Sequence, residues 1–231
     1  MTQAMLQVKD LHAYYGKSHV LRGVDMEIMP GEVIALLGRN GVGRSTTAKA
    51  IMGEVTPRGE VLFKGEPIAG LESHKIARMG LGYVPESRDI FPSMTVRQNL
   101  VLGVKDMRNP GKYTIDEMLD MFPNLRARAD NPAGVLSGGE RSRGVLATLL
   151  GRPINFLILD EPTNHLDITS REILMEALKE FEGTLVIVSH DRHFLKAVSN
   201  RTIMVEGGQI RPFEGGYAEF LASDQGNAQA R

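Results

Sequence analysis

A glycine-rich segment, residues 38–45 (GRNGVGRS), has residue types and spacing that could hold a phosphate chain. It fits the pattern G-x-x-x-x-G-basic-Ser/Thr, in which glycines let successive backbone N–H groups turn inward around an anion. A helix that starts here adds about half a positive charge. The Ser45 hydroxyl can reach a Mg²⁺ ion. The segment predicts a nucleotide-phosphate site; the alternative is a glycine-rich turn without a ligand.

The basic residue of this segment is Arg44, where the pattern usually has lysine. Arginine keeps the positive charge and can donate two hydrogen bonds to phosphate oxygens, but its side chain is longer than that of lysine and ends in a planar group. Loss of one well-aimed donor to a transition state costs on the order of 10² to 10³ in rate. We expect the backbone cradle to retain phosphate binding, whereas Arg44 leaves the rate of hydrolysis open.

Two consecutive acids follow an apolar run in residues 157–161 (LILDE). Open α/β sheets bind ligands at the carboxyl ends of their strands, which is where this pair should lie. Successive strand residues point to opposite sides, so Asp160 and Glu161 should have different roles. One can hold Mg²⁺ through water, and the other can orient or deprotonate an attacking water. The alternative is a pair of acids that cap the next helix.

A serine followed by two glycines, in residues 136–140 (LSGGE), precedes a helical pattern. Ser137 is a good N-cap, and Glu140 completes a capping box. The functional alternative is a second anion site, because Gly138 and Gly139 leave backbone N–H groups bare. Since the glycine-rich segment 38–45 is already predicted to bind one nucleotide, a second phosphate site indicates a composite site shared between two chains.

Two single residues are further candidates. Tyr15 precedes Gly16 and could stack on a base, although a lone tyrosine more often packs. His190 follows the apolar run 184–189 and could contact a terminal phosphate, although a histidine at a strand end is usually structural.

The elements around these residues predict an α/β protein with a mainly parallel sheet. Apolar runs that indicate buried strands span 33–37, 155–160 and 184–189, and helical patterns follow at 45–52, 170–181 and 191–198. Antiparallel strands are expected before residue 35 and a hairpin at 201–210. Between about 87 and 153 the spacing turns helical. We therefore expect one domain, with a core in 1–86 and 154–231 and a helical subdomain in 87–153.

Composition excludes several classes of protein. The chain has 231 residues, 42% of them hydrophobic, which is enough for a sizeable core. It has no cysteine, so disulfides and thiolate metal sites are excluded. A net charge of −1 disfavours nucleic-acid binding driven by bulk charge. No apolar run could span a membrane and no secretory signal is seen, so the cytoplasm is expected.

Together these motifs resemble the ATP-binding subunit of the ATP-binding cassette (ABC) family, from about residue 6 to residue 221. The resemblance implies a P-loop NTPase fold with an N-terminal antiparallel β subdomain, and ATP hydrolysis with Mg²⁺. It implies that Glu161, His190 and Arg44 are catalytic. It implies Mg²⁺ contacts from Ser45, Asp160 and Glu86, the last standing where the family has glutamine. The implied nucleotide contacts are Tyr15, Gly38, Arg39, Asn40, Gly41, Val42, Gly43, Arg44, Ser45, Thr46, Ser137, Gly138, Gly139 and Asp167.

The two halves of the chain resemble different subfamilies. The first half, through residue 103, is similar to ATPases of branched-chain amino-acid and urea importers. From residue 136 onward it is similar to ABC-F proteins, which act on ribosomes and normally carry two cassettes and a linker. The importer resemblance implies a homodimer or heterodimer with a second ABC ATPase, docked on membrane permease subunits at the inner face of the membrane, without nucleic acid. The alternatives are a ribosome-associated factor and a nucleotide-dependent dimerisation module with weak hydrolysis.

Overall fold

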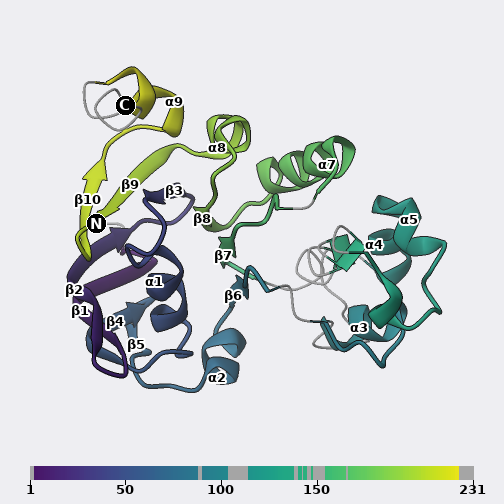
Figure 1. Ribbon diagram of the computed structural model, residues 1–231, viewed down its shortest axis with the longest axis horizontal. Coiled ribbons are helices and arrows are strands. Elements are labelled where there is room, and N and C mark those ends of the chain that lie inside the picture. Colours follow the sequence, from purple (N-terminus) through teal and green to yellow (C-terminus); the bar gives the residue numbers. More distant parts are fainter. Residues whose placement is uncertain are drawn as a thin grey trace. The chain divides into compact units, whose positions relative to one another are not determined.

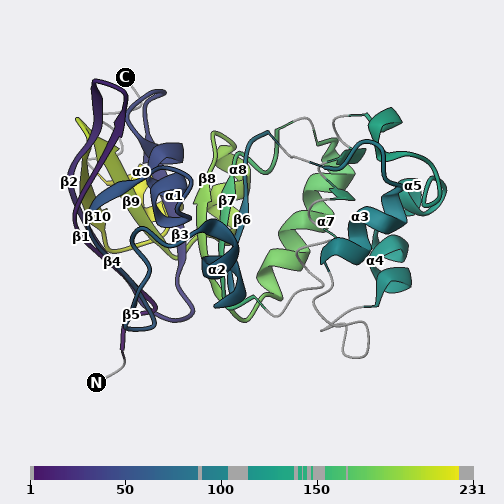
Figure 2. The ribbon, with the colours of Figure 1, turned by 90° about the horizontal axis from the view of Figure 1, so that it is seen from below.

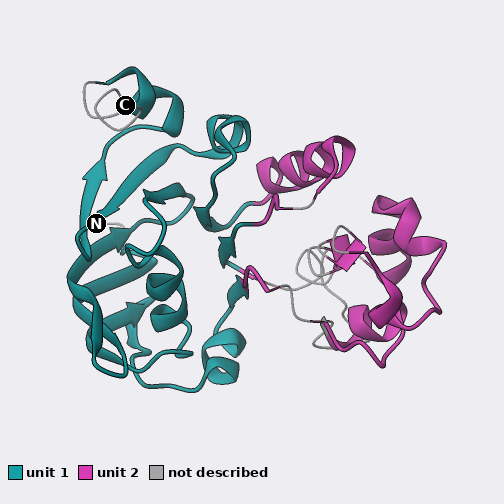
Figure 3. Cartoon of the chain, in the orientation of Figure 1, with its two compact units in different colours: residues 1–83, 155–161, 182–231 teal, residues 84–154, 162–181 magenta. Residues whose placement is uncertain are grey.

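The computed structural model describes residues 3–87, 90–103, 114–137, 140–141, 143–144, 147, 154–164 and 166–223. Figure 1 labels their helices and strands. By compactness the chain divides into two units, which Figure 3 colours separately: unit 1 is residues 1–83, 155–161 and 182–231, and unit 2 is residues 84–154 and 162–181. The expected core and helical subdomain, divided at residues 87 and 153, stay a prediction.

The described strands form two sheets. The first is antiparallel and follows the order β2-β1-β4-β5, with β1 at Leu6–Tyr15, β2 at Ser18–Ile28, β4 at Pro57–Phe63 and β5 at Glu66–Pro67. The second follows the order β10-β9-β3-β8-β7-β6, with β3 at Val33–Gly38, β6 at Leu81–Val84, β7 at Phe156–Asp160, β8 at Thr184–Val188, β9 at Arg201–Glu206 and β10 at Gln209–Phe213. Strands β9, β3, β8 and β7 run parallel, and β10 is antiparallel to β9.

The helices divide between the units. Unit 1 holds α1 at Arg44–Ile51, α2 at Ser73–Arg78, α8 at Arg192–Val198 and α9 at Tyr217–Ala222. Unit 2 holds α3 at Val96–Gly103, α4 at Ile115–Met121, α5 at Pro123–Arg126, the 3₁₀ turn η1 at Ala133–Val135 and α7 at Ile168–Lys179. The described residues between 140 and 147 are also helical.

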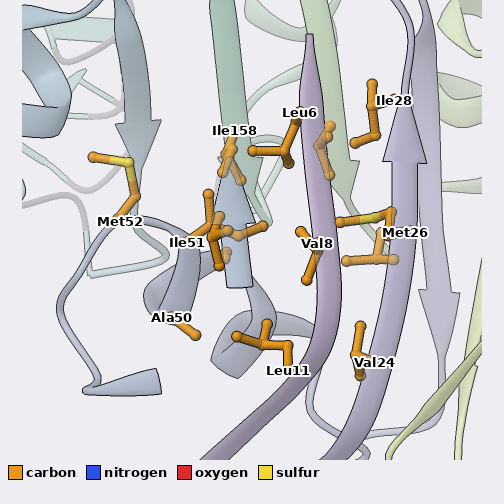
Figure 4. Close-up of a cluster of buried hydrophobic side chains, with 14 of the residues drawn as sticks. Leu6, Val8, Leu11, Val24, Met26, Ile28, Ala50, Ile51, Met52 and Ile158 are labelled. Carbon is orange, nitrogen blue, oxygen red and sulfur yellow. The ribbon is translucent and has the colours of Figure 1, made fainter. Parts of the chain in front are cut away.

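The core of unit 1 lies between its two sheets, with α1 between them (Figure 2). Figure 4 shows Leu6 and Val8 of β1 directed toward Ile51 of α1 and Ile158 of β7, and all four side chains are at most 2% exposed. Every residue of β7 and β8 is buried, as expected for parallel strands covered on both faces. Packing in this core fixes the orientation of β3, β7 and β8, and therefore the positions of their carboxyl ends.

Unit 2 has a separate core. It is formed by apolar side chains of α3, α4, α5 and the segments beside them, with Ile173 of α7 packed against it. Phe122 and Leu125 are at most 2% exposed. Leu136 belongs to this smaller cluster, so the helix start at Ser137 directly follows a residue of the unit 2 core.

The predicted fold class is confirmed: the sheet is mainly parallel and an antiparallel β sheet precedes it in the chain. The sequence reading missed β5, α5 and α9, each of six residues or fewer, because so short an element has too few positions for a period to show. Part of the helical pattern expected after residue 140, and residues 224–231, lie outside the described residues.

Candidate nucleotide site

The loop between β3 and α1 forms the predicted phosphate cradle. Gly38 and Gly43 have φ angles of 152° and 111°, in the left-handed region that favours glycine. A Cβ on Gly43 would lie 2.7 Å from Leu21 Cδ2, and one on Gly38 would lie 2.6 Å from the carbonyl oxygen of Val205. Glycine is therefore required at both ends of the loop for reasons of conformation and space.

Helix α1 starts with N–H groups available to an anion. Gly43 is its N-cap and makes no side-chain cap, and the N–H of Thr47 makes a helical bond to the Gly43 carbonyl at 2.8 Å. The N–H groups of Arg44, Ser45 and Thr46 precede that bond, at the positive end of the helix dipole. Of the other predicted contacts in the loop, Arg39, Asn40 and Gly41 are exposed and Val42 packs against the core.

The side chain of Arg44 turns toward the carboxyl ends of β7 and β8. Its Nη2 donates to Asn40 Oδ1 at 3.0 Å and lies 2.8 Å from His190 Nε2, while its Nη1 lies 3.8 Å from Glu161 Oε1. His190 Nε2 also lies 2.9 Å from Asn40 Oδ1 and 3.4 Å from Glu161 Oε1. The structure thus brings together Asn40, Arg44, Glu161 and His190, which we call the strand-end cluster.

Glu161 is held in an unusual position at the end of β7. Its φ is +50°, uncommon for a residue with a side chain, and its N–H donates to the Val188 carbonyl at 2.7 Å. Its Oε2 accepts a hydrogen bond from the His190 N–H at 3.2 Å. Burial raises the pKa of the Glu161 carboxyl above its ordinary value, against the opposing effects of His190 and Arg44. A carboxylate with a raised pKa is better suited to accept a proton near neutral pH.

Asp160 points to a different partner, as the alternation of strand residues predicts. Its Oδ1 accepts a hydrogen bond from the Ser45 hydroxyl at 3.1 Å, and it is 2% exposed. The Tyr83 hydroxyl lies 3.5 Å from Asp160 Oδ2, and burial raises the pKa of Tyr83, so this phenol stays protonated. Tyr83 was not predicted from the sequence, because no local pattern shows that its strand, β6, lies beside β7.

This pair of oxygens suits Mg²⁺. The ion usually takes one or two carboxylates, a hydroxyl and substrate phosphates, and it keeps several waters. Ser45 and Asp160 supply one hydroxyl and one carboxylate beside the cradle. No group of three or more His, Asp or Glu side chains suited to a metal occurs among the described residues. The expected third contact, Glu86, is exposed in the turn after β6 and belongs to unit 2.

Tyr15 ends β1 and is 49% exposed, so about half of the residue is accessible to solvent. Its neighbour Tyr14 instead stacks on His19, with ring centroids 4.3 Å apart. Tyr14 therefore packs against His19, and the stacking of Tyr15 on a base stays a prediction.

In unit 2, Ser137 forms the predicted capping box. Its N–H and hydroxyl donate to Glu140 Oε2, both at 2.8 Å, and Ser137 Oγ accepts from the Glu140 N–H at 3.3 Å. Arg128 Nε lies 3.1 Å from Glu140 Oε1. Gly138 and Gly139 lie outside the described residues. The structure therefore gives Ser137 its structural role, and its contact with a phosphate stays a prediction.

Asp167 also has a structural role that the sequence reading missed. It is the N-cap of α7, where Oδ1 accepts from the Ser170 N–H at 2.7 Å, and its Oδ2 lies 3.0 Å from Arg143 Nη1. The Ser170 hydrogen bonds hold the pKa of Asp167 below its usual range. Asp three residues before Ser170, at the start of a helical pattern, was the signal for this cap.

Comparison with known proteins identifies relatives of two kinds. Residues 21–164 match the family model described as ABC transporter. A probable branched-chain amino acid transport ATP-binding protein LivF from Archaeoglobus fulgidus is 33% identical over 227 residues, which cover 96% of each chain. The ATP-binding protein Uup from Haemophilus influenzae is 34% identical over 239 residues, which cover 98% of this chain and 35% of Uup.

A solved structure shows the same fold. CbiO1 from Clostridium perfringens, described as part of the ABC transporter complex cbiONQ, superposes with a TM-score of 0.73 at 29% identity and covers 98% of this chain and 94% of its own. The mixed resemblance found in the sequence is thereby confirmed: importer-type and ABC-F-type proteins both occur among the relatives.

Proposed function

The chain belongs to the ABC transporter family of ATP-binding domains, and from this membership we propose that it is the motor subunit of a branched-chain amino-acid or related importer. The observation that carries the proposal is the alignment with LivF, which extends over 96% of both chains. The segment from Glu86 to Gly103, similar in sequence to importer ATPases, adds support. In this proposal ATP closes a dimer, hydrolysis reopens it, and permease subunits convert the cycle into substrate movement.

The proposed chemistry starts from the cradle. The backbone of Gly38–Thr46 and the Arg44 side chain bind the phosphates, and Tyr15 stacks on the base. A water attacks the γ-phosphorus, the bond from phosphorus to the ADP oxygen breaks, and the Glu161 carboxylate accepts the proton of the water. His190 contacts the γ-phosphate. The burial of Glu161 and its hydrogen bond from the His190 N–H support this assignment.

Ser45 and Asp160 would hold Mg²⁺, with Glu86 as the proposed third contact. When bound, the ion neutralises charge on the β- and γ-phosphates. The Ser45–Asp160 contact of 3.1 Å already places both oxygens side by side.

The second half of the site is proposed to come from another subunit. ABC ATPases work as dimers, commonly with membrane permeases. Ser137, Gly138, Gly139 and Asp167 would face the nucleotide of a second ABC ATPase, either a copy of this chain or a related one. None of the described helices has the length and apolarity needed to cross a bilayer. We place the assembled protein at the inner face of the membrane through its permease.

The deciding experiment measures ATP hydrolysis with and without a candidate importer membrane domain in proteoliposomes. We expect the membrane domain to be retained with the chain and to stimulate hydrolysis, and Glu161→Gln to abolish the stimulated rate. A rate that stays the same with every importer membrane domain, with no co-purification, would contradict the motor proposal.

An ABC-F-like role is the second candidate, and the C-terminal part of unit 1 favours it. The segment EGGQIRPFEGGYAEFL, similar to ABC-F proteins, forms β10 and α9, whose Phe213 and Phe220 rings pack edge to face at 5.4 Å. The chain spans about a third of the length of Uup. Co-sedimentation with ribosomes that depends on ATP would support this role, and its absence at low salt would remove it.

A dimerisation module with weak hydrolysis is the third candidate, favoured by Arg44. Steady-state phosphate release by the wild type and by Arg44→Lys tests it. A wild-type rate equal to that of the lysine variant would exclude it.

A further inference from the structure

Arg44 has two possible partners for its charge. Its backbone lies in the phosphate cradle at the first residue of α1, while its guanidinium lies among the side chains at the ends of β7 and β8. The Arg44 and Glu161 side chains are only 9% and 7% exposed, and Nη1 lies 3.8 Å from Oε1. Because both charges are withdrawn from water, each depends on the other more than an exposed pair would.

The other members of the strand-end cluster hold the guanidinium on the Glu161 side. Asn40 Oδ1 accepts from Arg44 Nη2 at 3.0 Å, and His190 Nε2 lies 2.8 Å from the same nitrogen. Glu161 is in turn held by the His190 N–H at Oε2. Oε2 is therefore hydrogen-bonded, whereas the buried Oε1 has no hydrogen bond and its contacts are the charge of Arg44 at 3.8 Å and the His190 ring at 3.4 Å.

We propose that Arg44 makes this site select nucleoside triphosphates over diphosphates, because its guanidinium exchanges the Glu161 carboxylate for the γ-phosphate. This inference rests on the proposed nucleotide site and adds a specificity-determining role for Arg44. With a diphosphate, the arginine stays paired with Glu161. With a triphosphate, the arginine moves to the γ-phosphate and Glu161 becomes free to act on water.

The exchange is favourable for the γ-phosphate in particular because of its position. Like the terminal β-phosphate of a diphosphate, it carries nearly two negative charges and can accept two parallel hydrogen bonds from arginine, whereas the carboxylate carries one charge. The inner phosphates can bind the N–H groups at the start of α1 without moving Arg44. The γ-phosphate is also the group proposed to lie near His190, where the guanidinium already is.

Calorimetric titration of the purified chain with Mg²⁺-AMP-PNP and with Mg²⁺-ADP tests the proposal. Glu161→Gln removes the carboxylate charge that competes for Arg44. We expect this variant to bind AMP-PNP about tenfold more tightly than the wild type and to bind ADP within about twofold of it. An equal gain for both nucleotides, or none for either, would overturn the proposal.

Glu161→Gln in an Arg44→Gln background distinguishes exchange of Arg44 between its two partners from simple repulsion of the nucleotide by the Glu161 carboxylate. If Glu161 acts by holding Arg44, its replacement should change AMP-PNP affinity by about twofold or less when the arginine is gone. A tenfold gain in both backgrounds would mean that the carboxylate merely repels the nucleotide. Glu60→Gln is the control for charge: Glu60 is exposed, pairs with Lys9 in unit 1, and should change neither affinity.

Thermal unfolding provides a second measurement that does not depend on nucleotide binding. A double-mutant cycle of Arg44→Gln and Glu161→Gln should show favourable coupling without nucleotide, and this coupling should disappear in saturating Mg²⁺-AMP-PNP. Zero coupling without nucleotide would overturn the proposal. All these assays use the chain without a permease, so failure of the importer proposal leaves their outcome unchanged, whereas lack of binding by both nucleotides would remove the nucleotide site itself.

Discussion

Two regions of this molecule put similar polar side chains to different uses. In the strand-end cluster, contacts join residues far apart in the chain, with Arg44 and His190 separated by 146 positions. In unit 2, two capping boxes, Thr114 with Glu117 and Ser137 with Glu140, join residues three positions apart. The cluster depends on the sheet to bring its members together, whereas each capping box is complete within one helical turn.

This difference separates groups placed for chemistry from groups placed for folding. Glu161 is buried and close to two cationic or ionisable partners, so its charge state responds to whatever binds there. Glu117 is exposed and satisfied by its own helix start, so only local structure depends on it. Substitutions in the two regions should accordingly differ in what they change.

The largest expected effect is on the cluster. Glu161→Gln should slow steady-state ATP hydrolysis by at least about 100-fold, because the amide cannot accept the proton of the water. Phosphate release measures the rate, and nucleotide binding should be retained. Unchanged hydrolysis would mean that another group is the base and that the cluster is structural.

Ser45→Ala should affect only the magnesium-dependent part of nucleotide binding. Removing the hydroxyl that contacts Asp160 should weaken Mg²⁺-ATP binding by about 30-fold, within the range for a disturbed metal site. Binding of ATP in excess chelator should stay the same, since the backbone cradle is intact. Equal losses with and without magnesium would indicate damage to α1 instead.

The two capping boxes allow a matched test of Ser137. Ser137→Ala and Thr114→Ala remove the same set of hydrogen bonds, so each should lower the free energy of unfolding by about 1 kcal/mol in denaturant titrations. If Ser137 also contacts a nucleotide across a dimer, only Ser137→Ala should reduce ATP hydrolysis, by about tenfold. Equal activities of the two variants would leave Ser137 with its structural role alone.

The smallest expected effect is the response of α4 to acid. The Thr114 backbone and hydroxyl hydrogen bonds hold the pKa of Glu117 below its ordinary value of 4.5. Because this pKa is lower in the folded state, the stabilisation is present above about pH 4.5 and is lost as pH falls through the folded pKa. An NMR titration of the Glu117 carboxyl carbon checks the shift, with Thr114→Ala as control. Titration at the ordinary value in the wild type would contradict it.

The same contrast explains how far the sequence could be interpreted. The capping box at Ser137 was predicted because its spacing lies within five residues. The cradle was predicted because Gly38, Gly43 and Ser45 form one local pattern between a strand and a helix. Different partners for Asp160 and Glu161 followed from the alternation of strand residues, and the structure shows Ser45 beside one and His190 beside the other.

The contacts that cross the sheet could not be predicted in this way. Pairing of Arg44 with Glu161 and His190 depends on where β3, β7 and β8 lie in the strand order, which no local pattern specifies. Tyr83 was missed for the same reason, since it meets Asp160 only through the order of the strands. The N-cap role of Asp167 could have been predicted from its spacing to Ser170, but Asp167 was interpreted as a nucleotide contact instead.

The left-handed backbone at Glu161 has a consequence for engineering. A glycine would adopt the φ of +50° without strain, and loss of Arg44 together with Glu161 would remove both partners of the buried ion pair, so the double replacement should make the fold more resistant to heat than loss of Glu161 alone. Directed evolution that rewards thermostability alone would therefore favour joint loss of these two side chains. A campaign on this protein should score catalytic turnover in every round.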